Sequence, residues 1–328
     1  MPIKDVRSNP EDLTLTVTAE YPVTVERLWD AFADPRQFEK FWGPEQWPAT
    51  FTRHDMAPGG QSLYYMTGPD GTRSHGWFRF LSVNPCRGFE VEDGFGKEDG
   101  TPDESMPTMR MVYTFASLPS GGSTFTSVAY FPSLEAMENL VAMGMVEGMK
   151  SALGQLDDVL ADLSAFAASR PTEAQILSDT QVRISRVIRG SVEQVWRAHH
   201  EPALLQRWLL GPEGWTMPVC ELASEVGGRY RYEWENTDGS QRFGFEGEVL
   251  ESEPPYREVT SERMTGMDGP ATTNEMTLTP VGAGTLLSIV ITYPSAEVRD
   301  AALGTGMVGG MEQSYARLED SVLEAAVA

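Results

Sequence analysis

Cysteine and histidine are scarce in this chain of 328 residues. Its two cysteines, Cys86 and Cys220, fall one in each half, and its four histidines include no pair with the i, i+4 spacing of a helical zinc site. Neither a phosphate-binding loop nor a dinucleotide-binding fingerprint is present. We therefore expect structural thiols, no metal site and no cofactor.

Basic residues are also scarce. Lys and Arg number 25 against 48 Asp and Glu, which gives a formal net charge of −23 at pH 7. Such a chain repels phosphate backbones and anionic headgroups, so nucleic acid and membrane partners are not expected. No stretch approaches the roughly 20 apolar residues of a membrane span, and the N-terminus lacks the apolar segment of a secretion signal. These absences predict a cytoplasmic protein.

What the chain does contain is one pattern that occurs twice. The segments VERLWDAFADP, at 25–35, and VEQVWRAHHEP, at 192–202, share five residues at identical spacing. The later landmarks that keep their order at nearly the same offset are Trp47 and Trp215, Gly-Gly at 59 and 227, Asp-Gly at 70 and 238, and Gly144–Met149 and Gly306–Met311. Ordered repetition of this length indicates a tandem duplication. The predicted domains are 1–165 and 181–328, with 166–180 as the linker.

Each copy has the same order of expected elements. An alternating strand at 13–18, or 182–187, precedes the repeated helix, which is bounded by proline. A meander of antiparallel strands follows, and its clearest pair joins 229–234 to 242–247 through the turn Asn-Thr-Asp-Gly. One long helix, at about 133–163 or 295–325, ends the copy. A curved sheet with one apolar face needs such a cover, so the predicted fold class is α+β.

Both copies contain the same series of motifs. It begins with V-x-x-V/L-W-x-A-x-x-x-P and continues with an aromatic residue shortly before Gly-Pro, then G-G-x-x-x-Y, Asp-Gly and a terminal helix with Gly-Met. It resembles the Activator of Hsp90 ATPase homologue branch of the START/Bet v 1-like (SRPBCC) superfamily, and the resemblance covers nearly the whole chain. It implies two tandem helix-grip domains, each a curved antiparallel sheet wrapped around a long C-terminal helix. It also implies a cavity between sheet and helix that often holds an apolar small molecule.

Aromatic and methionine side chains are the candidates to line the two cavities, with ordinary core packing as the alternative. The residues expected to bind ligand are Trp42, Trp47, Tyr64, Met66, His75, Trp77, Met145 and Met149 in the first copy and Trp208, Trp215, Tyr232, Trp234, Phe243, Met307 and Met311 in the second. Two glycine pairs, Gly144 with Gly148 and Gly306 with Gly310, have a spacing that places both members on one helix face. We expect that face either to be open for a ligand or to pack closely on the sheet.

Catalytic patterns are sparse. His75 alternates with Trp77 along its strand and is expected to face the first cavity, where it and Arg79 are the candidates for catalysis. The adjacent His199 and His200 are expected to be solvated, and the acidic, glycine-rich segment 92–100 to be a mobile loop. In the second copy Phe243 occupies the position of His75 and Tyr230 that of Ser62. The second cavity is therefore predicted to be more apolar and more filled.

Three functions are compatible with these features. The first is binding of an apolar or aromatic small molecule between sheet and C-terminal helix, without catalysis. The second is an enzyme of the polyketide cyclase or aromatase kind, which the same superfamily contains. The third is protein interaction of the Hsp90 co-chaperone type, for which the sequence indicates no particular partner. We expect the first function, with the first copy as the more open site.

Overall fold

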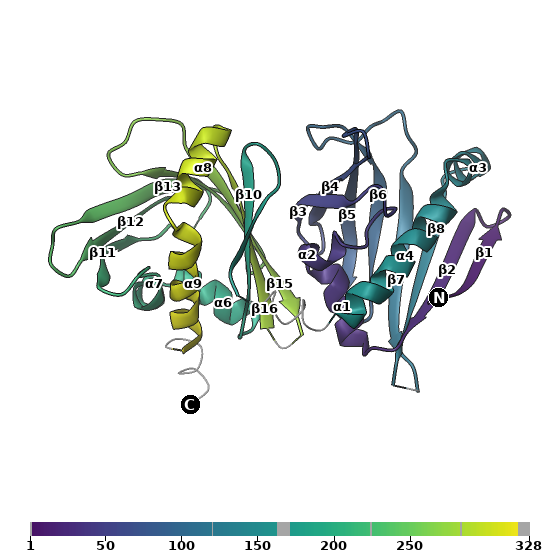
Figure 1. Cartoon of the computed structure of the whole chain (residues 1–328), viewed down its shortest axis with the longest axis horizontal. Coiled ribbons are helices and arrows are strands. Elements are labelled where there is room, and N and C mark those ends of the chain that lie inside the picture. The colour runs from purple at the N-terminus through teal and green to yellow at the C-terminus, as the bar shows by residue number, and fades with distance from the viewer. Residues whose placement is uncertain (1, 120, 163–170, 224, 283, 321–328) are drawn as a thin grey trace. The chain divides into compact units, whose positions relative to one another are not determined.

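The computed structural model describes residues 2–119, 121–162, 171–223, 225–282 and 284–320 (Figure 1). The chain divides into two compact units, Met1–Ser164 and Ala165–Ala328, and each is described by itself. Each unit combines an eight-stranded antiparallel sheet with helices, which confirms the predicted helix-grip architecture of class α+β. The first five residues of the expected linker and the predicted helix residues after 162 and 320 lie outside the described residues.

The sheet of the first unit has the strand order β1-β2-β8-β7-β6-β5-β4-β3. Its strands are β1 (Ile3–Asn9), β2 (Thr14–Tyr21), β3 (Ala49–His54), β4 (Gln61–Thr67), β5 (Arg73–Asn84), β6 (Gly88–Gly96), β7 (Met109–Ser117) and β8 (Ser123–Tyr130). Its helices are α1 (Val25–Ala33), α2 (Pro35–Phe38), α3 (Leu134–Ala142) and α4 (Met145–Ala161). Figure 1 shows α4 lying across the sheet.

The second unit repeats this arrangement with the strand order β11-β12-β13-β14-β15-β16-β10-β9. Its strands are β9 (Glu173–Ile176), β10 (Gln181–Ile188), β11 (Trp215–Glu221), β12 (Arg229–Asn236), β13 (Arg242–Glu253), β14 (Arg257–Met264), β15 (Thr272–Val281) and β16 (Gly284–Thr292). Its helices are α6 (Val192–His200), α7 (Pro202–Trp208), α8 (Ala296–Gly304) and α9 (Met307–Leu318).

The sequence supplies an N-terminal cap for the repeated helix and a proline shortly after its end. Thr24 accepts a hydrogen bond from the Arg27 N–H (3.3 Å) at the start of α1, and Ser191 forms a capping box at the start of α6. Pro35 and Pro202 then begin α2 and α7. Proline suits this first helical position, because an N–H there would have no hydrogen-bond acceptor within the helix.

The predicted strand pattern is confirmed in its main parts and incomplete at the sheet edges. β12 pairs with β13 as expected, with Trp234 opposite Phe243. The edge strands β1 and β9, which pair with β2 and β10, are not predicted by the pattern. Neither has an alternating row of buried apolar residues. Because β9 comprises residues 173–176, this part of the expected linker belongs to the second sheet.

The expectation of a single long terminal helix in each copy is wrong, because a glycine interrupts it. Gly144 separates α3 from α4 with a φ of 91°, and Gly306 separates α8 from α9 with a φ of 81°. A left-handed residue cannot continue a right-handed helix, and glycine adopts this conformation without a side-chain penalty. An added Cβ at either position would meet no atom within 4 Å. Backbone conformation, rather than close packing on the sheet, therefore explains these two glycines.

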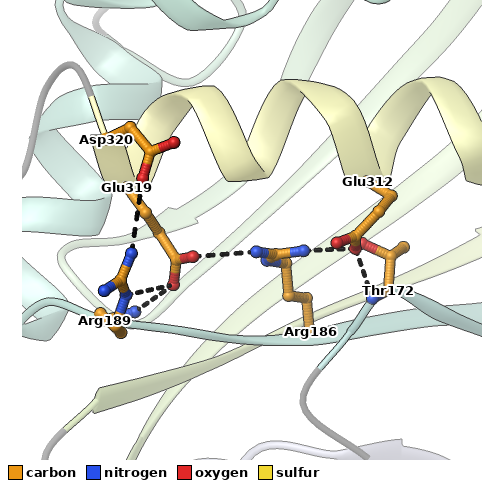
Figure 2. A network of polar contacts seen from close by, with 6 residues as sticks. All are labelled: Thr172, Arg186, Arg189, Glu312, Glu319 and Asp320. Atoms are coloured by element: carbon orange, nitrogen blue, oxygen red, sulfur yellow. Dashed lines mark hydrogen bonds and ion pairs between the residues drawn. The ribbon is translucent and has the colours of Figure 1, made fainter.

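Buried charges hold α9 to its sheet (Figure 2). Arg186 of β10 pairs with Glu312 of α9 and with Glu319, which directly follows α9. The Arg186–Glu319 distance is 2.9 Å, and the two side chains are only 8% and 9% exposed. The backbone N–H groups of Thr172 and Arg189 donate to Glu312 and Glu319, each at 2.7 Å. Burial alone would raise the pKa of Glu312, but the hydrogen bonds from Arg186 and Thr172 outweigh it and hold the pKa at about 2.

The first domain joins helix and sheet through different contacts. The buried Ala19 of β2 stands 167 residues before Arg186, which is the offset between the two copies of the repeated helix. The Tyr21 hydroxyl donates to the Leu153 carbonyl of α4 at 3.0 Å. Arg27 of α1 donates to a second carbonyl of α4 at 2.8 Å. Neutral groups and one cation thus fulfil here the role of the charge network in the second domain.

Gly144→Ala should destabilise the first domain by roughly 1–2 kcal/mol, because alanine there has to adopt a left-handed conformation. Gly154→Ala is the matched control: Gly154 lies inside α4, and an added Cβ meets no atom within 4 Å. Alanine favours the helix over glycine by about 1 kcal/mol. The thermal unfolding midpoint of the full chain should therefore fall for the first variant and rise for the second. Shifts in the same direction would contradict this account.

Arg186→Leu should destabilise the second domain by about 3–5 kcal/mol, because it leaves a buried carboxylate without its cation. The corresponding unfolding transition in calorimetry should fall by at least about 6 °C. Arg189→Leu is the control, since that side chain is 64% exposed and its backbone N–H is retained. It should cost no more than about 1 kcal/mol. Equal effects of the two variants would show that Arg186 is not the group that holds α9.

The low pKa of Glu312 predicts a loss of stability in acid. Its folded-state pKa of about 2 lies below the ordinary value of 4.5, so its stabilising effect is complete above about pH 4.5 and disappears as the pH falls toward 2. Denaturant unfolding of the wild type and Glu312→Gln, compared between pH 6 and pH 3, measures this effect. The stability difference between the two proteins should shrink as the pH falls, and a constant difference would contradict the prediction.

Candidate functional site

A cavity of about 320 Å³ lies in the first domain between the sheet and the terminal helices α3 and α4. Its wall is mainly apolar and rich in aromatic and methionine side chains. The residues that line it are Phe32, Phe41, Trp42, Gly43, Pro44, Tyr64, Met66, Ser74, His75, Gly76, Asp93, Gly94, Phe95, Met109, Met111, Tyr113, Phe125, Leu140, Met143, Gly144, Met145, Gly148, Met149, Ala152 and Leu153. The break between α3 and α4 therefore forms part of the wall.

Tyr64 and Trp42 form one aromatic side of the cavity. Their rings lie edge to face, with centroids 6.2 Å apart and planes at 86°. Tyr64 lies over Gly76 of the neighbouring strand β5, where an added Cβ would come within 2.3 Å of the tyrosine ring. Glycine at position 76 therefore leaves the room that this ring needs against the sheet.

One acidic side chain, Asp93, borders this apolar cavity. Strand β6 places it opposite Phe78 of β5 and Met109 of β7, on the face that also carries the buried Val91. Burial raises the pKa of the Asp93 carboxyl to about 7. Its charge therefore changes within the neutral pH range, which is unusual for an aspartate.

Two tyrosine hydroxyls lie close enough to Asp93 to interact with it. Burial, with a smaller contribution from the Asp93 charge, raises the pKa of Tyr64 and of Tyr113, so both phenols stay protonated near neutral pH. The Tyr113 hydroxyl is buried, and no group in the described part of the chain hydrogen-bonds to it. Among the described residues, no lysine or arginine lines the cavity. The cavity is thus a largely apolar space with one titratable carboxyl and two phenols, and His75 also borders it.

Asp93 is not among the residues that the sequence pattern singles out, since it falls in the segment 92–100 that is expected to be a loop. The loop expectation is wrong for residues 92–96, which belong to β6, while residues 97–100 lie outside the strand. The alternation of Phe89, Val91 and Asp93 is the signal that could have identified it. That spacing puts a carboxyl on the apolar face of a strand.

Six of the eight residues expected at the first cavity border it. They are Trp42, Tyr64, Met66, His75, Met145 and Met149. Trp47 and Trp77 lie elsewhere, which corrects the expectation for both. The Trp47 ring occupies the space beside Gly68, where an added Cβ would come within 2.7 Å of it. Trp77 is adjacent to the buried Phe78 and therefore lies on the other face of β5. Its Nε1–H donates to the Phe95 carbonyl at 3.0 Å.

Of the two candidates for catalysis, His75 borders the cavity and Arg79 does not. Both alternate with the buried Phe78 along β5 and therefore lie on its other face. The His75 ring lies 5.8 Å from the ring of Tyr65, and Arg79 forms an ion pair with Glu92 at the surface. His75 borders the cavity, but its ring packs on the opposite side of the sheet.

The second domain holds a smaller cavity of about 140 Å³. Of the residues expected to bind ligand in this copy, only Tyr232 lines it within the described ranges. The lining residues are His199, His200, Leu205, Leu209, Leu222, Ala223, Tyr230, Tyr232, Val249, Glu258, Thr260, Glu262, Asn274, Met276 and Ile289. The cavity is smaller than the first, as expected, but the expectation that it is more apolar is wrong.

The other candidates of the second copy lie away from this cavity. Trp208 is buried in the core and donates from Nε1 to the Ala198 carbonyl at 2.9 Å. Trp234 likewise donates to the Leu209 carbonyl at 2.7 Å. The remaining candidates, which pack against neighbouring aromatic or aliphatic side chains, are Trp215, Phe243, Met307 and Met311. Core packing therefore describes Trp208 and Trp234, whereas Phe243 is 39% exposed and Trp215, Met307 and Met311 are partly buried.

His199 and His200 are not solvated as expected, since both border the second cavity. His199 Nδ1 lies 2.7 Å from the Val195 carbonyl, and burial lowers the pKa of the ring to about 4, so the ring is neutral near pH 7. The His200 ring stacks on Trp196 with centroids 3.8 Å apart, and its Nε2 lies 3.1 Å from Glu258. Protein groups thus pair with His199 Nδ1 and His200 Nε2, whereas His199 Nε2 has no hydrogen-bond partner in the described part of the chain.

Other classes of site have little support in the described part of the chain. Within it, no three His, Cys, Asp or Glu side chains are grouped so that they could hold a metal ion. None of the described helices is long and apolar enough to cross a membrane. Cys86 and Cys220 are both free and half-buried, and burial raises the pKa of each thiol. The neutral thiol is a poor nucleophile, as expected of a structural cysteine.

Several solved structures are similar to one half of the chain. Protein Ms6760 from Mycobacterium smegmatis is 42% identical with a TM-score of 0.46, and the match covers 49% of this chain and 98% of that one. A protein from Arthrobacter aurescens is 38% identical with a TM-score of 0.46, over 48% of this chain and 91% of that one. A protein from Rhodobacter sphaeroides is 34% identical with a TM-score of 0.44, over 48% and 99%. No protein of curated function matches the chain.

One family matches the chain twice. Its description is Activator of Hsp90 ATPase homolog 1-like protein, and the matched residues are 22–161 and 189–322. The two matches together span well over half of the chain, and each begins just before the repeated segment that forms α1 or α6. The chain therefore belongs to the Activator of Hsp90 ATPase homolog 1-like family and contains two domains of it in tandem.

Proposed function

We propose that the first domain binds an apolar small molecule in its cavity and does not convert it. The observation that carries this proposal is the cavity itself, about 320 Å³ of space with a wall of aromatic and methionine side chains. Sites for small organic ligands are typically concave and largely apolar, with volumes of about 300–1,000 Å³ and a few polar groups that fix orientation. Asp93, Tyr64 and Tyr113 are polar groups of its wall, together with Ser74 and His75.

The break between α3 and α4 supports this proposal, because it gives the cavity an adaptable edge. Met143, which is 62% exposed, and Met145 flank Gly144, and all three border the cavity. Methionine fits irregular or exchangeable neighbours. Gly148, one turn further on, adds no side chain, and the nearest atom to an added Cβ is 4.0 Å away in Pro44. These residues leave space that a ligand can occupy.

Two other functions have less support. His75 and Arg79 are the residues expected to catalyse a cyclase-like reaction, but Arg79 pairs with Glu92 at the surface. A chaperone interaction rests on the family description alone, and membership of a family does not fix a function. The cytoplasmic location and the lack of nucleic acid and membrane partners stay predictions from charge and composition.

Gly148→Phe should block the cavity, because the new ring would occupy the space beside α4. The neutral fluorescent probe N-phenyl-1-naphthylamine is expected to bind the wild-type chain and to bind this variant at least about tenfold more weakly. Gly310→Phe is the matched control: an added Cβ at Gly310 also lies 4.0 Å from a proline, Pro212, and Gly310 does not line the second cavity.

Fluorescence titration of the three proteins gives the dissociation constants, and their thermal midpoints report whether each variant is folded. The proposal predicts a loss of affinity in Gly148→Phe alone. It is wrong if the probe does not bind the wild-type chain, or if both folded variants bind it as the wild type does.

A further inference from the structure

The first cavity is bordered by a carboxyl, Asp93, that forms no ion pair with a lysine or arginine in the described part of the chain. Asp93 borders the cavity between Phe78 and Met109 of the neighbouring strands. Arg79 and Arg110 of those strands lie on the other face of the sheet, where they pair with glutamates of β6. An ionised carboxyl in apolar surroundings is costly unless a cation and hydrogen bonds stabilise it.

We propose that the ligand of this cavity is an apolar amine, whose protonated nitrogen pairs with the Asp93 carboxylate while its apolar body lies among the aromatic and methionine side chains. The inference rests on the proposed function, because it names the class of molecule that the same cavity takes. A ligand ammonium supplies both missing features, a positive charge and N–H donors. Hydrogen bonds between two charged groups are also stronger than those between neutral groups.

The two phenols complete the recognition of an ammonium group. Tyr64 and Tyr113 interact with Asp93, and the buried Tyr113 hydroxyl has no hydrogen-bond partner among the described residues. A phenol oxygen can accept a hydrogen bond from the ammonium while its O–H donates to the carboxylate. The Trp42 and Tyr64 rings attract a cation placed over their faces. These groups all favour positive charge at this position.

Charge disfavours apolar acids, such as fatty acids, as ligands of the same cavity. Their carboxylate would add a second negative charge beside Asp93. Residues 1–164 carry 24 Asp and Glu against 12 Lys and Arg, and such an excess raises the local concentration of cations. Because burial brings the pKa of Asp93 to about 7, the carboxyl ionises readily near neutral pH when a cation arrives.

The second domain satisfies its buried acid with protein groups. Glu262 borders the smaller cavity, the Tyr230 hydroxyl lies 3.3 Å from its carboxylate, and Asn274 also hydrogen-bonds to it. For Asp93 the hydrogen bond comes from the backbone N–H of Gly94 instead. The first cavity thus leaves most of its carboxylate free to accept hydrogen bonds from a ligand.

Competition between two matched naphthalenes tests the proposal. 1-Naphthylmethylamine is a cation at pH 8, and 1-naphthalenemethanol has the same rings and reach without the charge. Each is used to displace N-phenyl-1-naphthylamine from the full chain, and the ratio of their dissociation constants is measured. We expect the amine to bind at least about tenfold more tightly at pH 8. The preference should largely disappear at pH 5.5, where the Asp93 carboxyl is protonated.

Asp93→Asn should abolish the preference for the amine, and continued binding of the neutral reporter shows that the cavity of this variant is intact. Glu92→Gln is the matched control. It removes the carboxylate of the adjacent residue, which pairs with Arg79 on the outer face, and should keep the preference. Equal affinity of amine and alcohol for the wild type, or a preference that survives in Asp93→Asn, overturns the inference and leaves the proposed function standing. Failure of the neutral reporter to bind the wild type overturns both.

Discussion

A left-handed glycine in each terminal segment is the constraint on which both domains depend. Gly144 and Gly306 turn the chain between two helices, so that α4 and α9 follow a direction that α3 and α8 do not share (Figure 1). In the first domain the residues around this turn also border the cavity. The position of the turn therefore decides both how the sheet is covered and where the wall of the cavity is adaptable.

The two copies combine this common frame with different contacts between helix and sheet. The first has the small, buried Ala19 on its inner strand, while the second has Arg186, which pairs with Glu312 and Glu319 (Figure 2). The difference parallels that of the cavities, which measure about 320 Å³ with mainly apolar walls and about 140 Å³ with histidine and glutamate in the wall. Duplication has thus allowed one copy to keep open apolar space and the other to accumulate paired polar groups.

In the first domain, Asp93 is a polar, ionisable residue in apolar surroundings. A carboxyl on the apolar face of a strand, with a pKa of about 7, is less stable there than an apolar residue of similar size. Departures of this kind from consistent patterning occur mainly at functional positions. The unpartnered Tyr113 hydroxyl nearby is a second departure within the described residues. Both groups border the larger cavity, and its volume and apolar wall are why it, rather than the smaller one, is the site that we assign to a ligand.

The sequence by itself determined the duplication, the order of the elements, the fold class and six of the residues around the first cavity, because repeats and period-two patterns are local properties of the chain. It did not determine the helix break, since a glycine within a helical pattern is compatible with both a continuous helix and a left-handed turn. Nor did it determine which face of β5 is buried. Aromatic residues stand on both faces of that strand, with Trp77 on one and Phe78 and Phe80 on the other. Only pairing with β4 and β6 and the cover of the helices decided that Phe78 and Asp93 face inward and that Arg79 faces outward.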